Sequence, residues 1–112
     1  RHKNYNRNKM ITRLVKMHFR EEEVDNFIAL FESVKEKISA MDGCKGVDLL
    51  RDVDNPQIFF TYSIWDSQKH LNQYRHSELF GVTWKATKAK FEKPAEAWSV
   101  EQLVGTLNNI LR

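Results

Sequence analysis

The sequence has few of the residues that cross-link or interrupt a chain. It has one cysteine, Cys44, so no disulfide can form within it. Four glycines and two prolines among 112 residues exclude a collagen-like or loop-dominated chain. No run of about 18 apolar residues occurs, so we expect no membrane partner and no spanning helix. Nothing resembles a secretory leader, and we therefore expect a cytoplasmic protein.

Apolar and aromatic residues are frequent enough to build a folded core. Hydrophobic residues make up 41% of the sequence and aromatic residues 12%. This composition excludes disorder throughout the chain. The length predicts one compact domain and is too short for two ordinary ones.

Positive charge is concentrated at the N-terminus. The net charge is +3, and residues 1–9 contain four Lys or Arg and no acidic residue. Removing these four from the 18 Lys and Arg leaves 14 against 15 Asp and Glu, a net charge of −1. A nucleic-acid-binding domain is expected to carry positive charge on its folded surface. We therefore predict no nucleic-acid partner and interpret residues 1–9 as a flexible basic arm; an arm that contacts phosphates is the alternative.

Hydrophobic periodicity in the first half of the chain predicts a strand, a helix and a hairpin. Residues 10–19 alternate as a strand, with Arg13 among apolar residues on one face. Residues 22–41 carry apolar side chains at helical spacing and end before Gly43. Residues 47–51 and 57–65 read as two strands joined by a polar turn, which makes them antiparallel.

The second half predicts helices followed by a last strand. Ser67 is the predicted cap of a short helix that ends near Arg75. Ser77 begins another helix, in which Phe80, Trp84, Thr87 and Phe91 share a stripe, and Pro94 is expected to end it. A strand follows within 95–104, and 105–112 reads as a short helix or tail.

The predicted order of elements is β-α-β-β-α(α)-β. This order is typical of the ferredoxin-like α+β fold, a four-stranded antiparallel sheet with helices on one face, here over residues 10–104. The other face would carry Leu14, Phe60, Tyr62 and Ile64, which are too apolar to remain in water. We therefore predict a homodimer in which two sheets cover each other.

Four segments follow one another in a distinctive order: the strand at 10–19, the helix FIALFESVKEKI with the turn at 43–46, the strand FFTYSIWDS, and YRHSELFGVTW. Together they resemble the antibiotic biosynthesis monooxygenase (ABM) family, whose members are dimeric α+β barrels. The step from Trp65 to Ser67, followed by Ser77-x-x-Phe80, is the most family-like part. The resemblance spans residues 10–103 and is more specific for a fold than for an activity.

The resemblance implies a ligand pocket between the sheet and its own helices. Family members that oxidise polycyclic phenols or quinols need neither metal nor flavin, because the deprotonated substrate passes an electron to dioxygen. We therefore predict a cofactor-independent monooxygenase that acts on a small aromatic or quinol-like molecule and dioxygen, with no bound cofactor or metal. His76 would manage the proton and Arg13 would meet the developing anion. Substrate contacts are expected from Trp65, Trp84, Tyr74, Ser63, Thr61 and Phe80.

Each of these roles has a structural alternative. His76 can simply flank the Ser77 cap, the tryptophans can be core residues, and Arg13 can pair with one of the protein's own carboxylates.

The sequence also departs from the family. Many relatives have a histidine where this chain has Tyr74. The haem-degrading branch needs an asparagine and an axial histidine where Val15 and Trp84 stand, so haem degradation is disfavoured. The alternative function is a non-catalytic dimeric module that binds ligands or partners, and packed side chains in place of a cavity would favour it.

Overall fold

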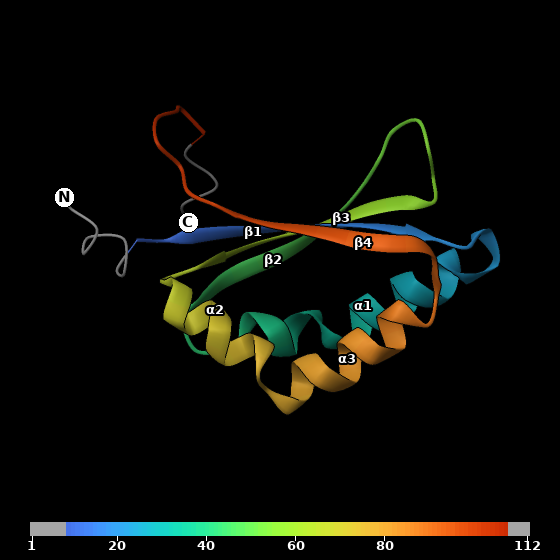
Figure 1. The fold of residues 1–112 in the computed structure, drawn as a ribbon, viewed down its shortest axis with the longest axis horizontal. Helices are drawn as coiled ribbons and strands as arrows, with labels where there is room; N and C mark the ends of the chain where they lie inside the picture. The colour runs from blue at the N-terminus through green and yellow to red at the C-terminus, as the bar shows by residue number, and fades with distance from the viewer. Residues whose placement is uncertain (1–8, 108–112) are drawn as a thin grey trace.

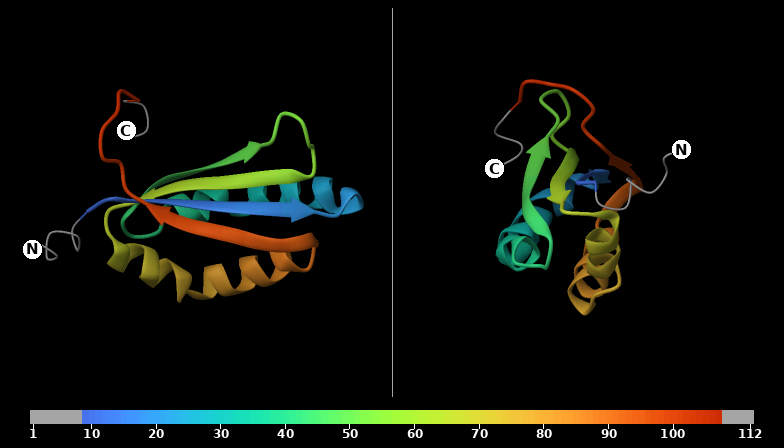
Figure 2. Two further views of the ribbon diagram at one scale, coloured as in Figure 1. Left: turned by 45° about the horizontal axis from the view of Figure 1, so that its top comes forward. Right: turned by 90° about the vertical axis from the view of Figure 1, so that its left-hand side faces the viewer.

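The computed structural model describes residues 9–107, which form one antiparallel sheet covered on one side by helices. The strands are β1 (Ile11–Phe19), β2 (Cys44–Arg51), β3 (Ile58–Trp65) and β4 (Phe91–Val100), in the order β2-β3-β1-β4. The helices are α1 (Val24–Ser39), α2 (Gln68–Arg75) and α3 (Glu78–Lys88), with a short 3-10 turn, η2 (Glu21–Glu23), before α1. All three helices lie on the same side of the sheet (Figure 1), as the views in Figure 2 also show. The predicted ferredoxin-like α+β fold is confirmed.

Parts of the predicted terminal segments lie outside the described residues. Of the predicted arm at 1–9 the structure describes residue 9 alone, and of the predicted tail at 105–112 it describes residues 105–107. Residues 101–107 continue from β4 on the side of the sheet opposite the helices (Figure 1). Within residues 9–107, no helix is both long and apolar enough to cross a membrane.

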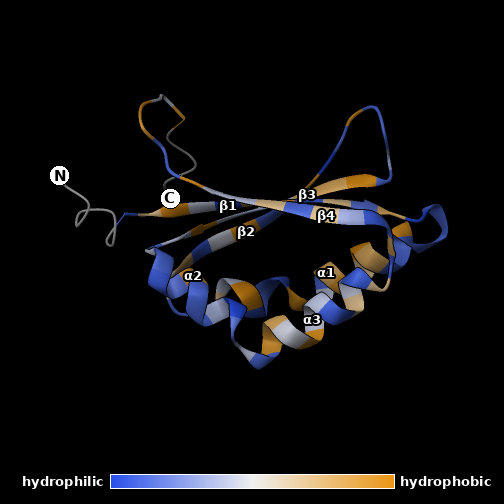
Figure 3. Cartoon of the chain, viewed as in Figure 1, coloured by the Kyte–Doolittle hydropathy of each residue, from blue (hydrophilic) through white to orange (hydrophobic). Residues whose placement is uncertain are grey.

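The core lies between α1 and the helix-covered face of the sheet. Apolar residues recur every three or four positions along α1, which places them on one face of the helix. Hydrophobic and hydrophilic segments alternate along α1 and α3 as this pattern requires (Figure 3). The buried α1 residues are Phe27, Phe31, Val34 and Ile38, and the sheet residues buried beneath this layer include Met17, Phe19 and Phe59.

Strand register decides which side chains share the helix-covered face. Arg13 of β1 is paired with Ser63 of β3 on one side and with Ser99 of β4 on the other. In the next row on this face, Val15 is paired with Thr61. Paired residues of antiparallel strands point to the same face of the sheet, and residues two apart along a strand share that face. Arg13, Val15, Thr61 and Ser63 therefore all point toward the helices, as their alternation predicts.

The predicted role of Pro94 is wrong. The helix ends at Lys88, and Pro94 lies within β4, which begins at Phe91. Phe91 therefore belongs to a strand and not to the helical stripe. Proline is tolerated because β4 is an edge strand and its pairing with β1 shifts between Lys16 and His18, opposite Pro94.

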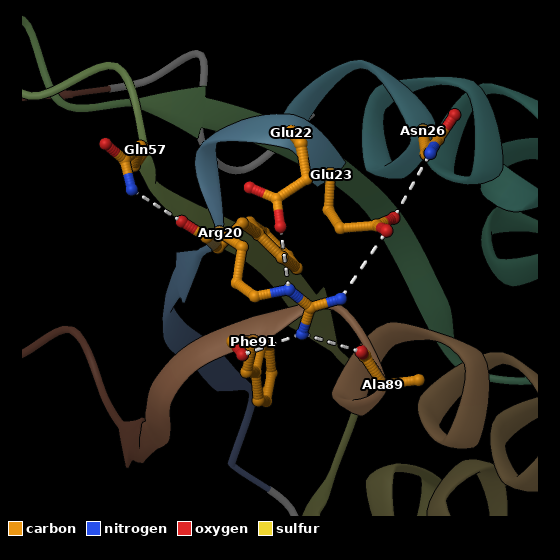
Figure 4. Close-up of polar contacts among 8 residues, drawn as sticks. Arg20, Glu22, Glu23, Asn26, Gln57, Ala89 and Phe91 are labelled. Atoms are coloured by element: carbon orange, nitrogen blue, oxygen red, sulfur yellow. Dashed lines mark hydrogen bonds and ion pairs between the residues drawn. The ribbon is translucent and has the colours of Figure 1, made fainter.

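One arginine fastens the beginning of β4 to the end of β1 (Figure 4). The Nη1 of Arg20 donates hydrogen bonds to the carbonyl oxygens of Ala89 (3.0 Å) and Phe91 (3.2 Å). Its Nε and Nη2 form ion pairs with Glu22 (3.3 Å) and Glu23 (3.4 Å). Since Ala89 directly follows α3, these contacts hold the end of that helix against the edge of the sheet.

Replacing Gly43 by alanine is expected to destabilise the fold by about 2–4 kcal/mol. Gly43 has a φ of +81°, and an added Cβ would overlap the ring of His70. The control is Gly81→Ala in α3, where no neighbouring atom lies within 4 Å of the added Cβ and where alanine is expected to stabilise the helix by about 0.5–1 kcal/mol. Urea unfolding measures both free energies. Equal stability of the two variants would contradict the close packing of Gly43 against His70.

Candidate functional site

A cavity of about 280 Å³ lies between the helix-covered face of the sheet and the helices. Every strand and every one of the three helices contributes to its lining, which is predominantly apolar and aromatic. The lining residues are Arg13, Val15, Met17, Phe27, Leu30, Phe31, Val34, Ile38, Val47, Thr61, Ser63, Leu71, Tyr74, Arg75, Phe80, Thr83, Trp84, Thr87, Ala95 and Ala97.

The cavity brings together most of the residues that the sequence nominates for a site. The nominated sheet residues come from neighbouring rows on the helix-covered face. The nominated helix residues come from the sides of α2 and α3 that face the sheet. The nominated residues that line the cavity are Arg13, Thr61, Ser63, Tyr74, Phe80 and Trp84.

Aromatic rings form a continuous wall on the helical side of the cavity. The Tyr74 and Phe80 rings meet edge to face, with centroids 5.2 Å apart. The Phe80 and Trp84 rings are stacked, with centroids 5.9 Å apart. Such a wall offers flat apolar surface to a planar ligand.

Trp65 does not line the cavity, so its predicted contact with a substrate is not supported. Its side chain is completely buried, and its Nε1 donates a hydrogen bond to the Oγ of Ser63 (2.9 Å). The Tyr74 ring stacks on it with centroids 4.9 Å apart. Trp65 lies in the row of the sheet beyond Ser63, where it supports two residues that do line the cavity.

His76 also lies outside the cavity, and its predicted role as the base there does not fit this position. The residue is the exposed C-cap of α2, and its Nδ1 donates to the carbonyl oxygen of Asn72 (2.8 Å). Leu71 marks the inward face of α2 because it is almost fully buried. At about 100° per residue, position 76 is rotated about 140° from Leu71 around the helix axis. Its ring borders a separate polar groove formed by residues of 66–76.

Arg75 is a lining residue that the sequence analysis missed. It stands four positions after Leu71, so both residues lie on one face of α2. That spacing was the available signal, since the inward face of α2 is set by its one strongly buried apolar residue. The sequence analysis nominates the neighbouring His76 instead, because an imidazole can accept and donate a proton near neutral pH.

Arg13 has no carboxylate partner among residues 9–107. Within these residues, the alternative that Arg13 pairs with one of the protein's own carboxylates is therefore not supported. Its Nη1 donates a hydrogen bond to the Oγ of Ser99 (2.9 Å). Burial lowers the pKa of Arg13, and the positive charge of Arg75 lowers it further. The guanidinium nevertheless remains protonated at neutral pH. The cavity therefore contains a positive charge that an anionic ligand could meet.

Tyr74 is a lining residue of the cavity that carries a phenolic hydroxyl. Burial, with a smaller effect from Cys44, raises the pKa of Tyr74 to about 12. The hydroxyl consequently keeps its proton at neutral pH and can donate a hydrogen bond. Within the described part of the chain, no group of three or more His, Cys, Asp or Glu side chains is placed to hold a metal ion.

Fold and cavity together define a class: a ferredoxin-like α+β domain that encloses an aromatic-lined pocket between its sheet and its own helices. A family model described as "Antibiotic biosynthesis monooxygenase" (ABM) matches residues 10–86. The chain belongs to this family, and the family resemblance of the sequence is confirmed.

Solved structures share the same fold. A conserved protein from Methanosarcina mazei Go1 has 20% sequence identity and a TM-score of 0.81, over 89% of this chain and 99% of that chain. A structure named antibiotic biosynthesis monooxygenase has 17% identity and a TM-score of 0.78, over 84% and 99% of the two chains. Rv0793 from Mycobacterium tuberculosis has 16% identity and a TM-score of 0.79, over 87% and 98%. The comparison with curated proteins gave no match.

Proposed function

We propose that this protein is a cofactor-independent monooxygenase that oxidises a small aromatic or quinol-like molecule with dioxygen. The observation that carries the proposal is a guanidinium, that of Arg13, within an aromatic-lined cavity of about 280 Å³. The ABM family and the structure of the same fold named antibiotic biosynthesis monooxygenase support this type of reaction. A largely apolar cavity with few polar groups suits an aromatic substrate.

The reaction balances without an external reductant. A quinol is converted to a hydroxyquinone when one oxygen atom of dioxygen enters the ring and the other leaves as water. The substrate supplies all four electrons that reduce dioxygen. The protein must bind the ring, favour its deprotonated form and keep bulk water from the reactive intermediates.

Arg13 would favour the deprotonated substrate. An opposite charge close to a phenol lowers its pKa by about 1–3 units, and the effect is strongest where water is excluded. The quinolate is the form that transfers an electron to dioxygen. Tyr74 would donate a hydrogen bond to a substrate oxygen, since its own proton is retained.

The proton would leave to water and not to a protein base. The lining of the cavity includes no His, Asp or Glu among the described residues. The main catalytic contribution is therefore electrostatic stabilisation of the anion by Arg13, in place of a general base.

We also propose that the protein functions as a homodimer that buries the open face of the sheet. Trp98, paired with Leu14 on that face, is 46% exposed, and Leu50 is also 46% exposed. Residues 101–107 border a groove on this face together with Leu14, Tyr62 and Ile64. Ile64 is only 8% exposed, whereas Leu50 and Trp98 remain accessible, so the face is covered only in part. Two copies packed sheet to sheet would remove this apolar surface from water.

Oxygen uptake with a panel of mono- and bicyclic quinols tests the proposed reaction. We expect consumption of dioxygen that depends on the enzyme, and one labelled oxygen atom in the product when ¹⁸O₂ is supplied. Uptake that forms hydrogen peroxide without label in the product would contradict monooxygenation. Tight binding of every quinol without oxygen uptake would favour the non-catalytic ligand-binding module.

Replacing His76 by alanine is expected to leave quinol oxidation within about threefold of the wild-type rate. His76 is exposed, and its ring lies outside the cavity, so it can neither touch a substrate there nor exchange a proton with it directly. Steady-state rates measured between pH 6 and 8 check this. A loss of more than about 100-fold would restore His76 as the base and contradict the cavity as the site of reaction.

A further inference from the structure

Among the described residues that line the cavity, two carry a positive charge and none carries a negative charge. Arg13 and Arg75 are the only charged side chains among the described lining residues. They come from different elements, β1 and α2, so the fold brings them to one cavity. Because these two guanidiniums are the only formal charges among the described lining residues, the electrostatic field in the cavity is positive.

The two guanidiniums are close enough to affect each other. The charge of Arg75 is one of the two causes that lower the pKa of Arg13, after burial. Within residues 9–107, neither arginine is in an ion pair, and the hydrogen bond of Arg13 goes to the neutral hydroxyl of Ser99. Like charges repel each other, and an anion bound by both guanidiniums would relieve this repulsion.

The helix dipole alone does not explain why Arg75 lies on the cavity side of α2. A positive residue in the last turn of a helix interacts favourably with the C-terminal end of the dipole. That interaction can be made from any side of the helix. Arg75 instead lies on the side of Leu71, which faces the cavity.

Cavity size limits the apolar part of the ligand. The volume of about 280 Å³ is nearly twice the roughly 150 Å³ of an engineered apolar cavity that binds benzene. One or two fused rings fit such a space, and the aromatic wall favours a planar molecule. The planar fork of a guanidinium matches the geometry of a carboxylate and can bind both of its oxygens.

We propose that this cavity selects an aromatic carboxylate of one or two rings, with the carboxylate held by Arg13 and Arg75. One carboxylate cancels one of the two positive charges, so a net positive charge remains beside the ring to stabilise the quinolate. Arg75 is then a specificity residue for the substrate of the proposed oxygenase. The inference depends on the proposed function in taking this cavity as the substrate site, but it concerns binding and not turnover.

Calorimetric titration with naphthalene-2-carboxylate and with its neutral analogue naphthalene-2-carboxamide tests the inference. We expect wild-type protein to bind the carboxylate at least about tenfold more tightly, the effect of a charge-assisted hydrogen bond. In Arg75→Gln and Arg13→Gln the preference should fall below about threefold while the amide binds as before. Arg75→Gln keeps the test valid if Arg13→Gln fails to fold, because residue 75 is exposed.

The matched control is Lys69→Gln, which removes one positive charge from the exposed part of the same helix without touching the cavity. It should retain the full carboxylate preference. Equal affinity of wild-type protein for the two probes, or an equal loss in Lys69→Gln, would overturn the inference. Quinol turnover without a preference for the carboxylate would support the oxygenase and contradict this inference. A preference for the carboxylate without any oxygen uptake would support this inference and contradict the oxygenase.

Discussion

Replacing Arg13 by glutamine is expected to reduce quinol oxidation at pH 7 by about 10- to 1000-fold. The range follows from the shift of about 1–3 pKa units that a nearby positive charge imposes on a phenol. Without the guanidinium, a smaller fraction of bound quinol is deprotonated at neutral pH. Arg13 lines the cavity and donates to a neutral hydroxyl, so its charge is not cancelled by another residue of 9–107.

The pH profile separates this effect from simple damage to the fold. In the Arg13 variant, the rate should rise as pH approaches the unshifted pKa of the quinol, near 10, because the substrate then loses its proton unaided. The control Lys85→Gln removes a positive charge from the exposed surface of α3, outside the cavity, and should keep the wild-type profile. An Arg13 variant with a full rate at pH 7, or one with an equal loss at every pH, would contradict electrostatic stabilisation of the quinolate.

Replacing Leu14 by aspartate is expected to convert the proposed homodimer to a monomer. Leu14 points to the open face of the sheet, where it is paired with Tyr62 and Trp98. A carboxylate buried between two sheets without a partner costs several kcal/mol, which weakens association at least about 100-fold. Sedimentation equilibrium should give 13.3 kDa for the variant and twice that mass for the wild type.

Val82→Asp is the matched control for the dimer. Val82 is 64% exposed on α3, on the opposite side of the sheet from Leu14, so this charge remains in water. The variant should stay dimeric. A wild-type protein that is monomeric at micromolar concentration, or a Leu14 variant that remains dimeric, would contradict association through the open face.

Local periodicity was sufficient to predict the fold. The alternation around Arg13 and Val15 assigned both to the face that the helices cover, and the register of β1 with β3 agrees. The long amphipathic helix is present within the predicted range, as α1. Pro94 was misread because its meaning depends on strand order: it would end a helix, but an edge strand with a register shift accommodates it.

The candidate site was less predictable because it depends on how deeply each side chain is buried and on how each helix is rotated about its axis. Trp65 alternates correctly with Ser63 along β3, but sequence cannot show that the Tyr74 ring covers it. His76 and Arg75 are adjacent in sequence, and only the burial of Leu71 shows which of them faces inward. That no carboxylate of residues 9–107 pairs with Arg13 is likewise visible only in the folded chain.

The central claim is that an aromatic substrate binds in the cavity between the sheet and the helices. Backbone amide shifts in two-dimensional NMR spectra, recorded during anaerobic titration with naphthalene-1,4-diol, test it most directly. We predict saturable shifts concentrated at cavity residues such as Thr61, Ser63 and Thr83. Little change is expected at Ser67 and Gln68, which lie in the separate polar groove formed by residues of 66–76. Shifts confined to that groove, or to the open face around Leu14 and Tyr62, would contradict the account.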